Sequence, residues 1–126
     1  MQFDPVEIIE FDAESSKPSG EGSLIDLHLK ISRPPSGWIR IFDTVWERHF
    51  YMMKRHAHAT TTHIVVRAMP DELQNKQLPE LKIVVEQSNE FFKKELEEQE
   101  RKEQALSDKK SKHEEEMRKL SDDLEI

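Results

Sequence analysis

The sequence predicts an α+β fold in which helices cover a small antiparallel sheet of three strands, and a long charged helical arm follows at the C-terminus. Three observations predict this class. Residues 25–31 alternate between apolar and polar side chains, residues 38–46 carry apolar side chains at helical spacing, and residues 97–126 are rich in Glu and Lys. The order of the patterns, β-β-α-β-α, is typical of a sheet with helices packed against it.

The three strands are expected at residues 6–13, 25–31 and 60–69. The second strand has the clearest pattern, because its four apolar residues alternate with polar ones, as in a strand with one buried face and one wet face. The third begins with three threonines and continues with β-branched residues, which favour strands over helices. Residues 15–23 are rich in Ser, Pro and Gly, and we expect them to form the loop between the first two strands.

Two helices are expected within the folded part of the chain. A Pro-Pro pair ends the second strand, Ser36 is the predicted N-cap of the first helix, and its apolar spacing continues to Trp46. We expect this helix to end between Arg48 and Lys54. The second helix is predicted to start near Pro79, because Pro is favoured in a first turn. Its predicted buried stripe comprises Leu81, Val84, Val85, Ser88, Phe91 and Phe92.

Charged residues make up 36% of the chain and are concentrated towards its C-terminus. We expect a small α+β domain over residues 1–96 and a charged helical arm over residues 97–126, with fraying or disorder at its end. Pairs of an acid and a base four residues later, such as Glu98 and Lys102, stabilise a solvated helix by about 0.2–0.5 kcal/mol each. The large apolar residues of the arm are Leu106, Met117, Leu120, Leu124 and Ile126.

The composition excludes several kinds of chemistry. The chain has no Cys, which removes disulfides, thiolate metal sites and cysteine nucleophiles. No apolar stretch approaches the length of a membrane-spanning helix and no signal-peptide pattern is present, so we expect a cytoplasmic protein without a membrane partner. The sequence has neither a nucleophile elbow nor a phosphate-binding glycine loop. We therefore expect a protein that is not an enzyme and uses no cofactor.

Histidines are concentrated in the middle of the chain, and the candidate metal ligands among them are His56, His58 and His63. On a strand, His56 and His58 would share a face. However, a zinc site needs three or four convergent ligands, and Lys54 and Arg55 place positive charge beside the pair. We therefore expect surface histidines and no metal site.

Residues 28–67 form a basic block in a chain whose net charge is −7. If this block binds nucleic acid, Lys54 and Arg55 are the most favourable phosphate contacts, because we expect them in a connector without a packing role. The aromatic residues beside these cations, which could stack on bases, are Trp38, Trp46, Phe50 and Tyr51. Against this function, Trp38 and Trp46 belong to the predicted core stripe, and the chain is acidic overall. Nucleic-acid binding is therefore an alternative. Its candidate contacts are Arg33, Arg40, Arg48, Lys54, Arg55 and Arg67.

The favoured interpretation is a non-enzymatic interaction and assembly module that forms a homodimer and binds another protein. The second helix carries more apolar residues than one narrow stripe holds, so we expect its flank, with Phe91 at the centre, to meet a two-fold mate. The arm would space or dock partners. The predicted interface residues are Val84, Phe91, Met117, Leu120 and Leu124. A small acidic inhibitor or immunity-type protein that masks a basic target is a further alternative.

Overall fold

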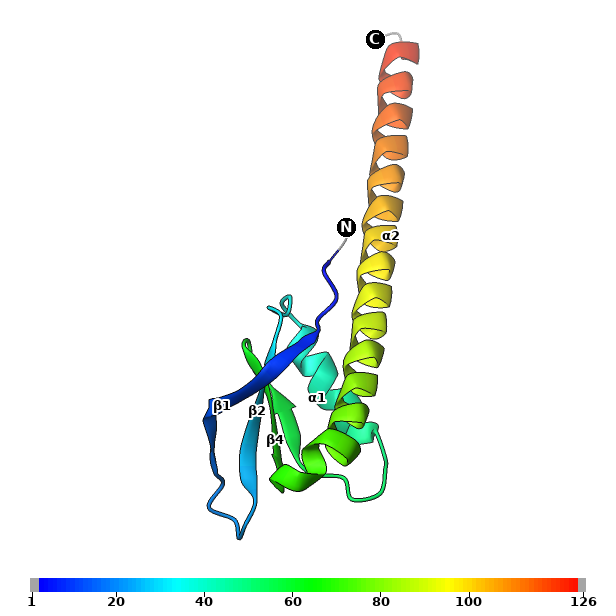
Figure 1. The fold of residues 1–126 in the computed structure, drawn as a ribbon. Coiled ribbons are helices and arrows are strands. Elements are labelled where there is room, and N and C mark those ends of the chain that lie inside the picture. Colours follow the sequence, from blue (N-terminus) through cyan, green and yellow to red (C-terminus); the bar gives the residue numbers. More distant parts are fainter. Residues whose placement is uncertain (1–2, 125–126) are drawn as a thin grey trace. The chain divides into compact units, whose positions relative to one another are not determined.

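The computed structural model describes residues 3–124, which form an α+β fold of a four-stranded sheet and two α-helices (Figure 1). The chain divides into two compact units between Lys93 and Lys94, and the first unit contains the sheet. A 3₁₀ turn at Pro70–Glu72 and a π turn at Leu73–Gln77 precede the last helix. The main elements are β1 (Ile8–Pro18), β2 (Ile25–Ile31), α1 (Trp38–Arg48), β3 (Ala57–Ala59), β4 (His63–Ala68) and α2 (Leu78–Asp123).

The sheet has the strand order β1-β2-β4-β3, and all neighbouring strands are antiparallel. Leu29 of β2 lies opposite Phe11 of β1 on one side and Ile64 of β4 on the other. The predicted three-stranded sheet is wrong by one strand, because β3 pairs with β4 at the outer edge. The three residues of β3 read Ala-His-Ala, and none has the β-branched side chain that predicts a strand.

β1 is longer than predicted, because a serine side chain bridges a break in its register. The pairing of β1 with β2 shifts after Asp12. In this gap the Ser16 hydroxyl accepts a hydrogen bond from the backbone N–H of His28 at 3.0 Å and donates one to the Asp12 carbonyl at 2.8 Å. The loop predicted at residues 15–23 is therefore partly wrong, since β1 continues to Pro18.

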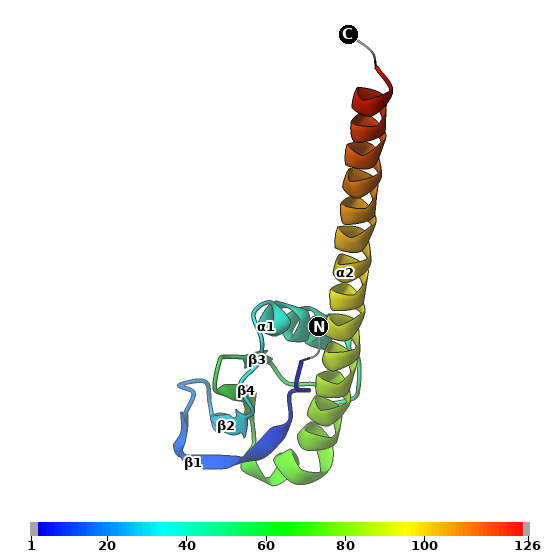
Figure 2. The same cartoon turned by 90° about the horizontal axis from the view of Figure 1, so that it is seen from above.

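One face of the sheet forms the core with α1 and the first turns of α2, which lie on the same side of the sheet (Figure 2). The alternating pattern of β2 is confirmed, and Leu29 is only 3% exposed. On α1 the rings of Trp38, Phe42 and Trp46 stack in a row, with successive centroids 5.5 and 6.3 Å apart. The buried residues of α2 are Leu81, Val84, Val85, Ser88 and Phe92.

The start of α1 differs from the prediction by one residue. Gly37 and not Ser36 occupies the N-cap position, with a left-handed φ of 92° that a glycine adopts without strain. The helix begins after a turn in which the backbone N–H of Trp38 donates to the Pro35 carbonyl at 3.1 Å. α1 ends at Arg48, within the predicted range.

α2 starts one residue before the predicted Pro79 and is helical to Asp123. In the second unit every residue from 97 to 124 is exposed. One of the expected acid–base pairs forms there, between Glu98 and Lys102, with an oxygen–nitrogen distance of 3.5 Å. The last two residues of the predicted frayed end lie outside the described residues. No helix within residues 3–124 is long and apolar enough to cross a membrane.

Candidate functional site

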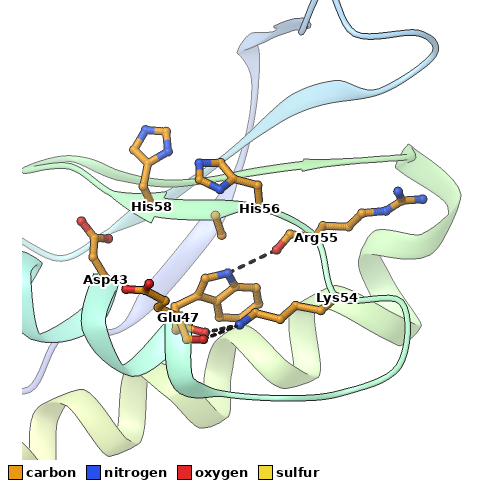
Figure 3. Close-up of a pocket in the computed structure, with 8 residues that line it drawn as sticks. Asp43, Glu47, Lys54, Arg55, His56 and His58 are labelled. Carbon is orange, nitrogen blue, oxygen red and sulfur yellow. Dashed lines mark hydrogen bonds between the residues drawn. The ribbon is translucent and has the colours of Figure 1, made fainter.

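A pocket of about 550 Å³ opens between α1 and β3 (Figure 3). α1 supplies two carboxylates and an indole to this pocket, and β3 with the residues before it supplies two imidazoles. The pocket is the candidate site because it combines acidic, basic and aromatic groups from two elements. Its lining residues are Asp43, Trp46, Glu47, Lys54, Arg55, His56, Ala57 and His58.

Lys54 stabilises the end of α1. Its ammonium donates hydrogen bonds to the backbone carbonyls of Trp46, of Glu47 at 3.2 Å and of His49 at 2.6 Å. Carbonyls at a helix C-terminus lack a partner within the helix, and a cation there interacts favourably with the helix dipole. The same ammonium lies 5.4 Å from the centre of the Trp46 ring. Lys54 is therefore a structural residue of the α1–β3 loop, which comprises residues 49–56.

Arg55 is also engaged in structure, and its side chain points away from the pocket (Figure 3). Its Nε donates to Oε1 of the buried Glu72 at 2.7 Å, and its carbonyl accepts from Nε1 of Trp46 at 3.2 Å. The hydrogen bond between the two side chains raises the pKa of Arg55 and lowers the pKa of Glu72. The expectation that Lys54 and Arg55 have no packing role is therefore wrong.

Four ionisable side chains of the pocket remain accessible. Asp43 and Glu47 lie one turn apart on α1, and Oδ1 of Asp43 accepts a hydrogen bond from the backbone N–H of Ala59 at 3.0 Å. The His56 and His58 rings have centroids 6.2 Å apart. Figure 3 shows the carboxylates and the imidazoles at different sides of the pocket. The pocket thus offers separate hydrogen-bonding groups and no assembled acid–base pair.

The structure does not bring the three candidate metal ligands together. His56 and His58 line the pocket, whereas His63 on β4 pairs with Asp12 of β1 at an Nε2–Oδ2 distance of 2.8 Å. In the part of the chain that the structure describes, no group of three or more His, Asp or Glu side chains could hold a metal ion.

A second polar cluster lies on the face of the sheet opposite the core, and sequence reasoning missed it. His28 and His63 have ring centroids 5.4 Å apart, and Asp12 accepts hydrogen bonds from Ser15 and His63. These bonds, first that from Ser15 and then that from His63, lower the pKa of Asp12 to about 2. The sequence does contain one sign of this cluster, because the alternation of β2 places His28 on the solvent-facing side of the sheet.

Three of the six candidate nucleic-acid contacts have partners inside the protein. Besides Lys54 and Arg55, Arg67 donates from Nε to Asp26 at 2.8 Å and from one terminal nitrogen to Glu21 at 3.1 Å. Trp38 and Trp46 are buried, so neither ring is accessible for base stacking. The other three candidates are exposed on the surface, and they are Arg33, Arg40 and Arg48.

The α1–β3 loop presents apolar side chains to solvent. Phe50 is 86% exposed and Met52 is 85% exposed, more than any other large apolar side chain within residues 3–124. Neither residue belongs to a helical or alternating pattern, so the hydrophobic spacing did not single them out. This exposed pair is therefore a feature that only the structure reveals.

The predicted interface residues have different surroundings. The prediction that Val84 lies at an interface is wrong, because this residue is fully buried in the core of its own chain and is inaccessible to a second chain. Phe91 was also expected in the buried stripe, but it is 56% exposed, and Ile83 on the same helix is 42% exposed. The three predicted residues of the second unit, Met117, Leu120 and Leu124, are all exposed.

Comparisons with known proteins assign no family to this chain. No protein family, curated protein or solved structure matches it. A functional assignment therefore rests on the chemistry and exposure of the residues described above.

Proposed function

We propose that this chain is a non-enzymatic interaction and assembly module that forms a homodimer through one flank of α2 and also binds another protein. The observation that carries the proposal is the exposure of Ile83 and Phe91 on a helix whose opposite face forms the core. The proposal assigns no catalytic role to the pocket, in which Lys54 and Arg55 serve structural contacts. The proposal includes a cytoplasmic location, which cell fractionation tests.

Ile83, Gln87 and Phe91 form a ridge along α2, because they follow one another at intervals of four residues. A second copy related by a two-fold axis presents the same ridge, and such isologous pairing is the commonest form of self-association. A buried aromatic pair contributes about 0.5–1.5 kcal/mol beyond its buried area. Removing two such ridges from water is thus a physical reason for the chain to pair.

The C-terminal segment makes a second and weaker contribution to the proposed assembly. Met117, Leu120 and Leu124 recur at helical spacing and are exposed. They span about two turns, whereas a coiled coil needs apolar positions over about three to four heptads. In the proposed module this segment spaces partners or docks them.

Sedimentation equilibrium at micromolar concentration tests the homodimer. We expect twice the chain mass of 14.9 kDa for the wild type and the mass of one chain for Phe91→Glu. The control is Leu106→Glu, since Leu106 is 69% exposed outside the proposed ridge and its change should leave the dimer intact. A monomeric wild type would refute the dimer, and a dimer that survives Phe91→Glu would refute this interface.

A further inference from the structure

The α1–β3 loop exposes three apolar side chains, which are Phe50, Met52 and, to a smaller extent, Met53 at 50%. Phe50 and Met52 point into solvent, while Tyr51 between them is partly buried and donates a hydrogen bond to Oε1 of Gln77. Tyr51 therefore anchors the loop to Gln77, and its two neighbours Phe50 and Met52 are presented to solvent.

The loop is held firmly in place. Gln77 is fully buried, and its Nε2 donates to the Met53 carbonyl at 3.0 Å while its Oε1 accepts from Tyr51. At the start of the loop, His49 contacts Glu80 of α2 with an Nε2–Oε2 distance of 2.5 Å. Side chains presented from an ordered backbone lose less entropy on binding than those of a mobile loop.

The backbone of Met53, within the same loop, has an unusual conformation. Its φ is 63°, which makes it the one residue other than glycine with a positive φ in the described part of the chain. A left-handed conformation is unfavourable for a side chain of this size, and such strain concentrates at functional positions. The strained residue directly follows Met52 and directly precedes Lys54, which anchors the loop to α1.

Exposed cations flank the apolar pair. Arg48 ends α1 immediately before the loop, and the ammonium of Lys76 lies 3.4 Å from the sulfur of Met53. Within residues 3–124, neither cation forms an ion pair with a carboxylate. The neighbouring acid, Glu47, lines the pocket between α1 and β3.

We infer that the α1–β3 loop is a docking element for a second protein, with Phe50 and Met52 entering an apolar pocket whose rim carries carboxylates. This inference rests on the proposed role as an interaction module but not on the homodimer. Phe and Met side chains are suited to such pockets, because Met and aromatic residues are enriched at interfaces and aromatic anchors are common hot spots. The expected occupant is a protein, because an exposed apolar pair flanked by two cations complements an apolar pocket with an acidic rim.

Selection from a random peptide library against the full chain tests the inference without a known partner. We expect the selected peptides to combine apolar and acidic residues, and to bind the Phe50→Ser/Met52→Ser double variant about tenfold more weakly or worse. The control is Ile9→Ser/Leu106→Ser, because these residues are similarly exposed, at 62% and 69%, and lie outside the loop. Circular dichroism verifies that both variants are folded.

Peptides that bind the loop variant as tightly as the wild type would overturn the inference, and so would a selection that yields no binder. Peptides that use the loop but are basic would overturn the carboxylate rim and favour the acidic-inhibitor alternative. The variants Arg48→Gln and Lys76→Gln should bind the selected peptides more weakly than the wild type does. If this difference in affinity decreases as the salt concentration rises, it would support a partner pocket with carboxylates at its rim.

Two further measurements distinguish other occupants. Co-sedimentation of the wild type, but not of the loop variant, with vesicles of phosphatidylcholine and phosphatidylserine would identify a membrane as the occupant. A dimer that is lost in the loop variant but kept in Phe91→Glu would identify a second copy of the chain. If instead the wild type is monomeric and its peptides depend on the loop, the homodimer fails while the docking element stands.

Discussion

Asn89 of α2 forms two hydrogen bonds with the backbone of Val6, donating from Nδ2 to the carbonyl and accepting at Oδ1 from the N–H, both at 3.0 Å. The same Oδ1 accepts from Nε1 of Trp38 at 2.9 Å. Asn89 thus serves Val6 as a neighbouring strand would, and it joins the segment before β1 to both helices of the first unit.

Replacing Asn89 with Ala should destabilise the first unit by about 1–3 kcal/mol, because the N–H of Val6 and the indole N–H of Trp38 would lose their partner in a buried environment. Urea unfolding followed by circular dichroism measures this change. Asn75→Ala is the matched control, since Asn75 is exposed. Equal stability of the two variants would show that water replaces the Asn89 amide.

Asp12 should make the stability of the protein depend on acid pH. Its pKa is lowered from 3.8 to about 2, chiefly by the hydrogen bond from Ser15 and next by that from His63. Because the folded pKa is the lower one, ionised Asp12 stabilises the fold above the unfolded value, and this contribution is lost as pH falls toward about 2.

The comparison of wild type with Asp12→Asn measures this contribution. We expect their difference in unfolding free energy to shrink as the pH falls from 3.8 toward about 2. Asp71→Asn, at an exposed position, should show no such trend. A difference between wild type and Asp12→Asn that does not change with pH would contradict the role given to Asp12.

A fragment of residues 1–96 should fold cooperatively and unfold at the same urea concentration as the full chain. All the buried apolar residues that the structure describes lie between Val6 and Phe92, and every residue from 97 to 124 is exposed. Circular dichroism and amide hydrogen exchange test the fragment. An unfolded fragment would show that the C-terminal segment belongs to the cooperative unit, and that the boundary after residue 96 is misplaced.

The chain should not bind single- or double-stranded nucleic acid, even at low salt. Three of the candidate phosphate contacts already serve internal partners, and the aromatic rings of α1 are buried. Fluorescence anisotropy with labelled oligonucleotides measures this. Binding whose salt slope decreases by about one on Arg40→Gln would support the alternative function, since each lost phosphate contact lowers the slope by about that amount.

The sequence predicted those elements whose spacing follows directly from a buried face. The alternation in β2 and the helical stripe of α1 were correct, because Leu29, Phe42 and Trp46 are buried where their periods place them. β3 was missed because a three-residue edge strand of Ala and His has almost no strand propensity. β1 was cut short because Ser and Pro indicate a loop, whereas the Ser16 hydroxyl maintains the contact with β2.

The candidate site was less predictable, because its properties depend on contacts between distant residues. Lys54 and Arg55 were recognised as cations, but their partners, the end of α1 and Glu72, are set by tertiary structure. Phe50 was named only as an aromatic residue beside the basic block, and Met52 was not singled out, since exposure of an apolar residue outside any periodic pattern has no signal in the sequence. Phe91 was placed at the flank of its helix and is exposed, whereas Val84 was assigned to the same flank and is buried.

The hydrogen bond from Ala59 to Asp43 also limits the growth of the sheet. β3 is an edge strand, and exposed edges with free N–H groups are templates on which other chains add strands and aggregate. Asp43 accepts a hydrogen bond from one of these N–H groups and places a negative charge beside it, and β3 has only three residues. The opposite edge, β1, breaks register twice and is a poor template. The sheet thus resists fibril-like extension at both edges, and this protects a chain that keeps apolar side chains on its surface.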